Sequence, residues 1–371
     1  MRELVCLDMP LGGAFIDRIV RAWDDGDAVF PLDQRLPQPA RRALMDSIRP
    51  TLVADTSGDT RLDGDPVEDD DAVVVATSGS SGEPKGVVLT RSAVNASAVA
   101  VMVRLGIGHG DTWFACLPPG HIGGLSVVLR SLVIGTPLVT APAFSPAAYE
   151  EAVRQGATLA SLVPTALARV DASLYRWIVL GGSRPPSERP ANCVATYGMT
   201  ETGSGVVYDG LPLPGVEIET RDGIIHVRGP MLMRSYRNGP APIDPDGWLR
   251  TGDIGGIDAD GRLTVHGREG DLIITGGENV WPEAVEAAIS THPGVTDCCV
   301  VGIDDPEWGS AVHAFVVASG EVSLNAIREH VKQTLPAHCA PKALHVIPSI
   351  PRTALGKPRR GDLVSSLAGQ D

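Results

Sequence analysis

The sequence predicts an α/β protein with a large N-terminal α/β domain that includes a β-rich subdomain, followed by a small α+β C-terminal domain. In the first part of the chain, apolar runs of strand length alternate with helical stretches, which favours a largely parallel sheet. From about residue 210 the pattern changes to short strands separated by Gly and Pro turns. A further compact α+β pattern begins near residue 268, so we expect domains at 1–268 and 269–371.

The first predicted elements surround a loop rich in glycine and serine. An acidic run at 63–71 is typical of a solvated loop. The segment 72–77 is β-branched and apolar on both faces, which predicts a buried strand. A second strand is expected at 87–89, and a helix at 91–103 with Ser92 as its candidate cap.

Further along the chain, strands are expected at 113–117 and 178–180, and helices at 146–154 and 165–170. The segment 223–228 is typical of the short strands of the β-rich subdomain.

The C-terminal domain shows its own helix and strand signals. Pro282 in a first turn predicts a helix, and strands are expected at 295–303 and 311–318. Ser323 is a candidate cap for a helix with one apolar face, made of Leu324, Ile327, Val331 and Leu335.

Composition narrows the functional classes. A formal net charge of −14 over 371 residues argues against non-specific binding to nucleic acid, because a basic face supplies most of that affinity. The 6 cysteines form no C-x-x-C pair, which favours a reduced, cytoplasmic protein. We expect no signal peptide and no membrane insertion, since no apolar run approaches about 18 residues.

The most specific chemical signal is the loop at 77–86. Glycines let a backbone approach an anion and turn several N–H groups toward it, while hydroxyls and a lysine add donors and charge. A flexible linker is the alternative, although a linker rarely lies between buried strands. The loop is no Walker A motif, because no Ser or Thr follows the lysine. The candidate phosphate-binding residues are Thr77, Ser78, Gly79, Ser80, Ser81, Gly82 and Lys85.

Four other segments are weak individually. An aromatic ring, a glycine and a carboxylate at 196–202 could stack a base and hold a metal, yet Tyr-Gly is also common in turns. The segment 247–253 ends in an aspartate that could accept from ribose hydroxyls, or it is a hairpin turn. Counting the loop at 77–86 as the first, the fourth segment is 267–280. The fifth, 351–357, contains a lysine near the C-terminus, and taken alone such a lysine is simply a solvated side chain.

Taken in this order, the five segments resemble the core motifs of the adenylate-forming superfamily, which includes acyl-CoA synthetases, luciferases and peptide-synthetase adenylation domains. The resemblance covers most of residues 72–360. The nearest likeness is to the short actinobacterial o-succinylbenzoate–CoA ligases of menaquinone biosynthesis. It rests on 196–202 continuing into 207–210, on 180–182 and on 275–277. The short stretch before the phosphate loop fits this subfamily and implies a trimmed N-terminal subdomain.

The resemblance implies the adenylate-forming enzyme fold and an ATP-dependent acid–thiol ligase. Such an enzyme activates a carboxylate as an acyl-adenylate, releases pyrophosphate and forms a thioester with CoA, using Mg²⁺. Two alternatives stay open: a ligase for another aromatic or medium-chain carboxylate, and a protein that loads a carrier domain. A non-enzymatic nucleotide-binding protein would need neither Glu201 nor Lys357. The partners expected are the carboxylate, ATP and CoA, and homo-oligomerisation stays open.

The resemblance also assigns nucleotide-binding roles. The adenine pocket would be lined by Gly181, Gly182, Ser183, Tyr197 and Gly198. The ribose would be bound by Asp253 and Arg268.

The catalytic roles fall on three residues. Thr200 would contact the α-phosphate and Glu201 would hold Mg²⁺, while Lys357 would bridge the attacking carboxylate and the α-phosphate. The C-terminal domain would be mobile, with its hinge at Gly270, where the family usually has a polar residue. Glycine tolerates both backbone conformations that a hinge visits. Gly276 and Gly277 would line the CoA channel.

The acyl side of the site involves His121, Ser204 and Arg130. By resemblance, His121 borders the acyl pocket, although a loop histidine with an ordinary partner is the alternative. Arg130 lies in the apolar run 127–134, where a buried charge is costly unless it is paired. In the succinylbenzoate ligases an arginine nine positions after this histidine looks like the partner of the aromatic carboxylate. The alternative is an arginine that reaches solvent or pairs with a protein carboxylate.

Overall fold

The computed structural model describes residues 2–78, 84–183, 185–186, 188–352 and 358–368. The chain forms two compact units. The first comprises residues 1–218 and 227–250, and the second comprises residues 219–226 and 251–371. Residues 251–268 belong to the second compact unit together with the residues that follow them. The domain boundary expected after residue 268 stays a prediction. None of the helices in the described residues is long and apolar enough to cross a membrane.

The first unit contains two seven-stranded sheets, each with a parallel centre. The first sheet has, in spatial order, β16 (Ser235–Tyr236), β6 (Pro84–Thr90), β5 (Asp71–Ser78), β2 (Ala28–Pro31), β1 (Leu4–Asp8), β3 (Leu52–Asp55) and β4 (Gly58–Arg61). The second has β13 (Leu211–Pro212), β12 (Ser204–Tyr208), β11 (Cys193–Met199), β10 (Trp177–Leu180), β9 (Leu159–Leu162), β7 (Trp113–Ala115) and β8 (Leu138–Thr140).

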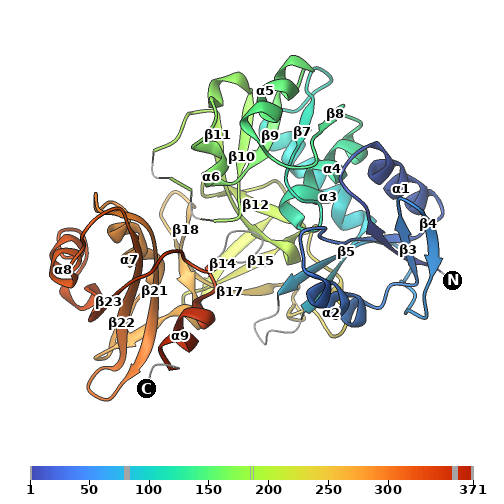
Figure 1. The fold of residues 1–371 in the computed structure, drawn as a ribbon. Coiled ribbons are helices and arrows are strands. Elements are labelled where there is room, and N and C mark those ends of the chain that lie inside the picture. The colour runs from blue at the N-terminus through green and yellow to red at the C-terminus, as the bar shows by residue number, and fades with distance from the viewer. Residues whose placement is uncertain (1, 79–83, 184, 187, 353–357, 369–371) are drawn as a thin grey trace. The chain divides into compact units, whose positions relative to one another are not determined.

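Helices connect and cover these strands. They are α1 (Gly13–Asp24), α2 (Gln38–Ile48), α3 (Arg91–Leu105), α4 (Ile122–Ile134), α5 (Pro146–Arg154) and α6 (Pro164–Leu167), with 3-10 turns η1 (Ala172–Leu174) and η2 (Thr200–Thr202). Helix α3 packs on β5 and β6, α4 packs on β7, β9 and β12, and the two helices pack on each other (Figure 1). The apolar residues of α4 therefore face protein on nearly every side, which explains why this helix is hydrophobic all round.

A third sheet has the order β14 (Glu217–Arg221), β15 (Ile224–Arg228), β17 (Leu249–Ile257) and β18 (Leu263–Arg268). The short η3 turn (Glu269–Asp271) follows β18. The expected short strands of this region are confirmed.

The last sheet is covered by helices on both faces (Figure 1). Its strands are β20 (Glu278–Val280), β19 (Ile273–Thr275), β22 (Gly309–Ala318), β21 (Val295–Asp305) and β23 (Ala343–Val346), and its helices are α7 (Pro282–Ile289), α8 (Leu324–Val331) and α9 (Arg360–Ala368). Alternate residues of β21 face opposite ways: Val300 packs with α7 and α8, whereas Cys299 and Val301 pack with Leu363 of α9.

Most predicted elements are confirmed, and three details differ. The cap of α3 is Thr90, whose hydroxyl accepts from the backbone N–H of Ala93, and not Ser92. The acidic run is not solvated to its end, because Asp71 is buried and forms a two-bond ion pair with Arg234. The helix expected at 165–170 is the single turn α6.

Candidate active site

The predicted phosphate loop joins two strands of the first sheet. Strands β5 and β6 pair antiparallel, with Thr77 opposite Lys85 at the end of the hairpin that is next to the loop. Gly79, Ser80, Ser81 and Gly82 lie outside the described residues, and Ser78 ends β5. The hairpin therefore presents the two described polar ends of the motif together.

Lys85, Tyr236 and Glu201 form a connected group in the first unit. The Lys85 Nζ lies 5.0 Å from the ring centroid of Tyr236, and the Tyr236 hydroxyl donates to Oε1 of Glu201 at 3.0 Å. Strand β16 places Tyr236 there by pairing with β6. The sequence has no local signal for Tyr236 as a partner of Glu201, because the two are 35 residues apart and Tyr236 belongs to a two-residue strand.

Glu201 is the residue that we predict to hold a metal. The described residues contain no cluster of three or more His, Cys, Asp or Glu that could hold a metal ion. Mg²⁺ typically binds through one or two carboxylates together with substrate phosphates and water. One carboxylate fixed by a tyrosine fits that mode, provided that ATP supplies the other oxygens.

The segment before Glu201 depends on a close approach of two strands. A Cβ at Gly198 would lie 2.2 Å from the backbone oxygen of Ser204. The close approach of β11 to β12 therefore requires glycine at position 198. The Thr202 hydroxyl accepts from the N–H of Met199 at 2.9 Å and closes the η2 turn. Thr200 and Glu201 are thereby held at the end of β11.

The predicted adenine-pocket segments lie on neighbouring parallel strands. Strand β10 leads into Gly181 and Gly182, and it pairs with β11, which carries Tyr197 and Gly198. The Thr196 hydroxyl donates to the Leu180 carbonyl at 2.8 Å, which ties the two strand ends together. Gly182 has a φ of +85°, a conformation that glycine adopts without strain. Ser183 follows on the exposed turn.

His121 is fixed by a buried carboxylate that the sequence analysis missed. Its Nε2 lies 2.9 Å from Oδ2 of Asp33, which also accepts two side-chain bonds from Arg35 at 2.9 and 2.8 Å. Burial alone would raise the pKa of Asp33. The hydrogen bonds from His121 and Arg35 outweigh that effect, and the pKa of Asp33 lies well below its usual range. An ionised Asp33 requires the proton of His121 on Nε2, which leaves Nδ1 for another partner.

Arg130 is a buried cation within α4. The residue is 4% exposed, and its Nε and Nη1 have no hydrogen-bond partner in the described part of the chain. Its guanidinium carbon lies 5.7 Å from the ring centroid of Trp113. No carboxylate pairs with it among the described residues, so neither an arginine in solvent nor a protein ion pair accounts for it.

Two neighbours complete the surroundings of α3 and α4. The Tyr208 hydroxyl is buried and finds no partner among the residues that the structure describes, and burial raises its pKa despite the nearby charge of Arg130. Ser204 is also buried, and its hydroxyl lies 3.1 Å from that of Ser97 in α3. Ser204 therefore has a protein partner that the sequence analysis did not identify.

In the second unit, the two predicted ribose-binding residues are direct neighbours. Asp253 and Arg268 oppose each other across β17 and β18, and Arg268 Nη1 lies 3.3 Å from Asp253 Oδ1. The Thr251 hydroxyl, buried against Ile225, accepts from the Asp253 backbone N–H at 3.0 Å. The pair is thus preorganised on adjacent strands.

The remaining predicted residues lie in turns of the second unit. Gly276 and Gly277 connect β19 and β20 with φ of +60° and +85°. A Cβ at Gly276 would lie 3.0 Å from the Trp308 ring, whereas space is open at Gly277 and at Gly270 in η3. Lys357 lies outside the described residues.

Comparison with known proteins gives consistent matches. The AMP-binding enzyme family matches residues 29–237, and the AMP-binding enzyme C-terminal domain matches residues 284–357. A Mycobacterium tuberculosis H37Rv protein named "Probable 2-succinylbenzoate–CoA ligase" is 39% identical over 368 residues, covering 90% of this chain and 95% of the relative. The 2-succinylbenzoate–CoA ligase of Bacillus licheniformis is 37% identical, covering 80% of this chain and 70% of the relative.

Solved structures agree. The o-succinylbenzoate CoA synthetase of Bacillus subtilis, in complex with its acyl-adenylate intermediate, has a TM-score of 0.88 and 28% identity, covering 97% of this chain and 88% of the other. The same enzyme with ATP and magnesium has a TM-score of 0.86 and 28% identity, covering 97% and 89%. The expected adenylate-forming fold is confirmed.

Proposed function

This chain belongs to the AMP-binding enzyme family, and we propose that it is an o-succinylbenzoate–CoA ligase of menaquinone biosynthesis. It activates the acid with ATP as an acyl-adenylate, releases pyrophosphate, and then transfers the acyl group to the thiol of CoA. Relatives with this name match over most of both chains, and the B. subtilis structures bind the corresponding ligands. The six cysteines are free and buried, which supports a reducing, cytoplasmic setting.

The chemistry requires positive charge where two anions meet. A carboxylate resists attack by a thiol because oxide is a poor leaving group, and AMP is a better one. Lys85 binds the phosphates and Lys357 neutralises the carboxylate and the α-phosphate in adenylation. Glu201, held by Tyr236, is the ligand for Mg²⁺, which when bound offsets charge on the phosphates. Thr200 binds the α-phosphate.

The other predicted residues take supporting roles in this proposal. The phosphate loop from Thr77 surrounds the β- and γ-phosphates, and Asp253 with Arg268 binds the ribose. Gly270 is the hinge. The adenine is bound by Gly181, Gly182, Ser183, Tyr197 and Gly198. The turn of Gly276 and Gly277 lines the path of the CoA thiol.

The observation that carries the choice of acid is Arg130. Burying a guanidinium with two unsatisfied donors destabilises the protein, because no hydrogen bond offsets the loss of water at those two nitrogen atoms. A planar carboxylate can accept two parallel N–H bonds from such a fork. A second carboxylate on the acyl substrate would therefore complete the site. His121, fixed by Asp33, and Ser204 are the other acyl contacts in this proposal.

The test is pyrophosphate release from a panel of carboxylic acids, with and without CoA. We expect o-succinylbenzoate to be used best and a thioester to form with free CoA. A simple benzoate or a medium-chain acid used equally well would overturn the assigned substrate. Thioester formation on a carrier protein but not on free CoA would overturn the assigned acceptor.

A further inference from the structure

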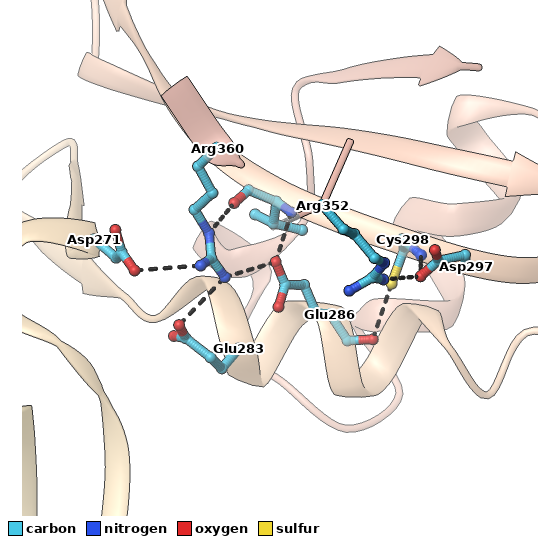
Figure 2. A network of polar contacts seen from close by, with 8 residues as sticks. Asp271, Glu283, Glu286, Asp297, Cys298, Arg352 and Arg360 are labelled. Atoms are coloured by element: carbon cyan, nitrogen blue, oxygen red, sulfur yellow. Dashed lines mark hydrogen bonds and ion pairs between the residues drawn. The ribbon is translucent and has the colours of Figure 1, made fainter. Parts of the chain in front are cut away.

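The guanidinium of Arg360 connects three separate parts of the second unit. Arg360 is the first residue of α9, and Figure 2 shows its side chain between Asp271, Glu283 and Glu286. The contacts measure 3.2 Å to Asp271 Oδ2, 3.2 Å to Glu283 Oε1 and 2.8 Å to Glu286 Oε1. Its Nε also donates to the Val300 carbonyl of β21 at 3.1 Å.

This cluster is largely withdrawn from solvent, which makes its contacts matter. The Arg360 side chain is 20% exposed, and its three partners are between 17% and 33% exposed. Glu286 Oε1 also accepts from the Val300 N–H at 2.8 Å, so the same atom fixes both α7 and β21. Removing one member of such a network leaves the others desolvated and unpaired.

The same arginine adjoins the segment that carries Lys357. Arg352 and Pro358 form an antiparallel bridge, and the Arg359 N–H donates to the Pro351 carbonyl at 2.8 Å. These bonds bring together the residues on either side of 353–357. Arg360 follows directly and binds that junction to α7 and β21.

A second anchor lies before the segment, and it is weaker. Arg352 pairs with Asp297 at 2.6 Å, but the two side chains are 36% and 37% exposed. Exposed pairs of this type contribute little, since water and salt screen them. Arg360, with three carboxylate partners, is the better shielded of these two anchors.

Asp271 connects the Arg360 network to the proposed hinge. It is the last residue of the η3 turn and directly follows Gly270, the proposed hinge. We propose that Arg360 is a positioning residue for adenylation: it ties residues 358–360, which follow the segment bearing Lys357, to α7 and to the turn after the proposed hinge. This inference rests on the proposed function, because it assigns Arg360 an effect only through Lys357. Misplacing a catalytic group by about 1 Å can cost on the order of a hundredfold in rate.

The experiment measures both half-reactions in the full-length enzyme. Arg360→Gln should lower single-turnover acyl-adenylate formation by about tenfold to a hundredfold. The reaction of CoA with supplied acyl-adenylate should change less than about twofold. Arg360→Lys keeps the charge and should recover part of the adenylation rate. Arg359→Gln is the matched control, since the Arg359 side chain is 56% exposed and pairs with Asp362 at 3.6 Å. This variant should stay near the wild-type rate.

A mutant cycle distinguishes positioning from general damage. In a Lys357→Ala background, Arg360→Gln should lower residual adenylation no further, because the residue acts through the missing lysine. A further tenfold loss in that background, or an equal loss in both half-reactions, would overturn the proposal. Should Arg360→Gln not fold, Arg360→Lys and Asp271→Asn carry the test, and wild-type adenylation by both would refute the role. A wild-type enzyme that activates no acid would instead refute the proposed function.

Discussion

Two arginines of this protein, Arg130 buried and Arg360 partly buried, have opposite surroundings. Arg130, in α4 of the first unit, has two donor atoms without a partner and no carboxylate beside it among the described residues. Arg360, at the start of α9 in the second unit, touches three carboxylates and a carbonyl. The second arginine has its counter-charges built into the fold, whereas the first lacks them. The difference fits our proposals that Arg360 holds elements of its own unit in place and that Arg130 binds a ligand.

The free energy of burying a charge differs between the two arginines. A fold gains nothing from an unpaired buried cation, so such a group destabilises the protein that carries it. A paired cluster is different, because its members satisfy each other and each becomes costly to remove. The two arginines should therefore respond in opposite ways to the same substitution. Three experiments test this expectation.

The largest effect on stability is expected at Arg360. Arg360→Leu leaves three partly buried carboxylates without their cation, and we expect a loss of about 3 kcal/mol. Hydrogen exchange of the backbone amides in α7 and β21 measures this loss locally. Arg359→Leu, at an exposed position, is the control and should change protection by less than about 0.5 kcal/mol. Equal effects from both would mean that the cluster contributes no more than an exposed charge.

Arg130→Leu should leave stability unchanged or raise it, because an unpaired charge is replaced by an apolar side chain. It should weaken use of the diacid by about 1.5–3 kcal/mol, or roughly tenfold to a hundredfold, since a charge-assisted bond is lost. Thermal denaturation without substrate measures the first effect, and kcat/KM for o-succinylbenzoate measures the second.

The control for Arg130 is an analogue that lacks the ring carboxylate. The variant should use this analogue as well as the wild type does, and ATP affinity should not change. A variant that still prefers the diacid by the wild-type margin would show that Arg130 does not read the carboxylate. A variant that unfolds would place Arg130 with Arg360 as a structural residue.

The same comparison shows what the sequence could predict. Arg130 could be singled out because it interrupts an apolar run, which is a local signal. Arg360 could not, because it follows another arginine and its carboxylate partners lie 74 to 89 residues away. Asp33 is similar, since 88 residues separate it from His121.

The elements were easier to predict than these contacts. Strands β5 and β6 and helix α5 follow from local patterns of apolar and capping residues. Asp71 shows the limit of such patterns. It ends an acidic run that predicts solvent exposure, yet Arg234, 163 residues later, buries and pairs it. Local composition cannot report a partner that only the folded chain supplies.

The smallest effect is expected from a substitution of Glu283. This residue belongs to the cluster in which three carboxyl groups surround the single positive charge of Arg360 (Figure 2). Burial raises the pKa of Glu283, and the nearby Glu286 and Asp271 add to this against the opposing charge of Arg360. Its Oε2 is buried and has no hydrogen-bond partner within the ranges that the structure describes. A raised folded-state pKa means that the folded protein holds the proton more tightly than the unfolded chain. The stability that this proton contributes is present at low pH and is lost as pH rises through the folded-state pKa.

Glu283→Gln keeps the shape and the acceptor for Arg360 but removes the titrating group. Its stability relative to the wild type should therefore rise with pH, beginning near the ordinary glutamate pKa of about 4.3 and levelling off above the folded-state pKa. Denaturation of both proteins between about pH 4 and pH 8 measures this difference, in which groups common to both cancel. The gain should be smaller than the loss from Arg360→Leu, because one carboxylate is neutralised while the cation and two partners stay. A difference that falls with rising pH would mean that Glu283 is ionised and stabilising in the cluster, and the three carboxylates would then all be needed to balance Arg360.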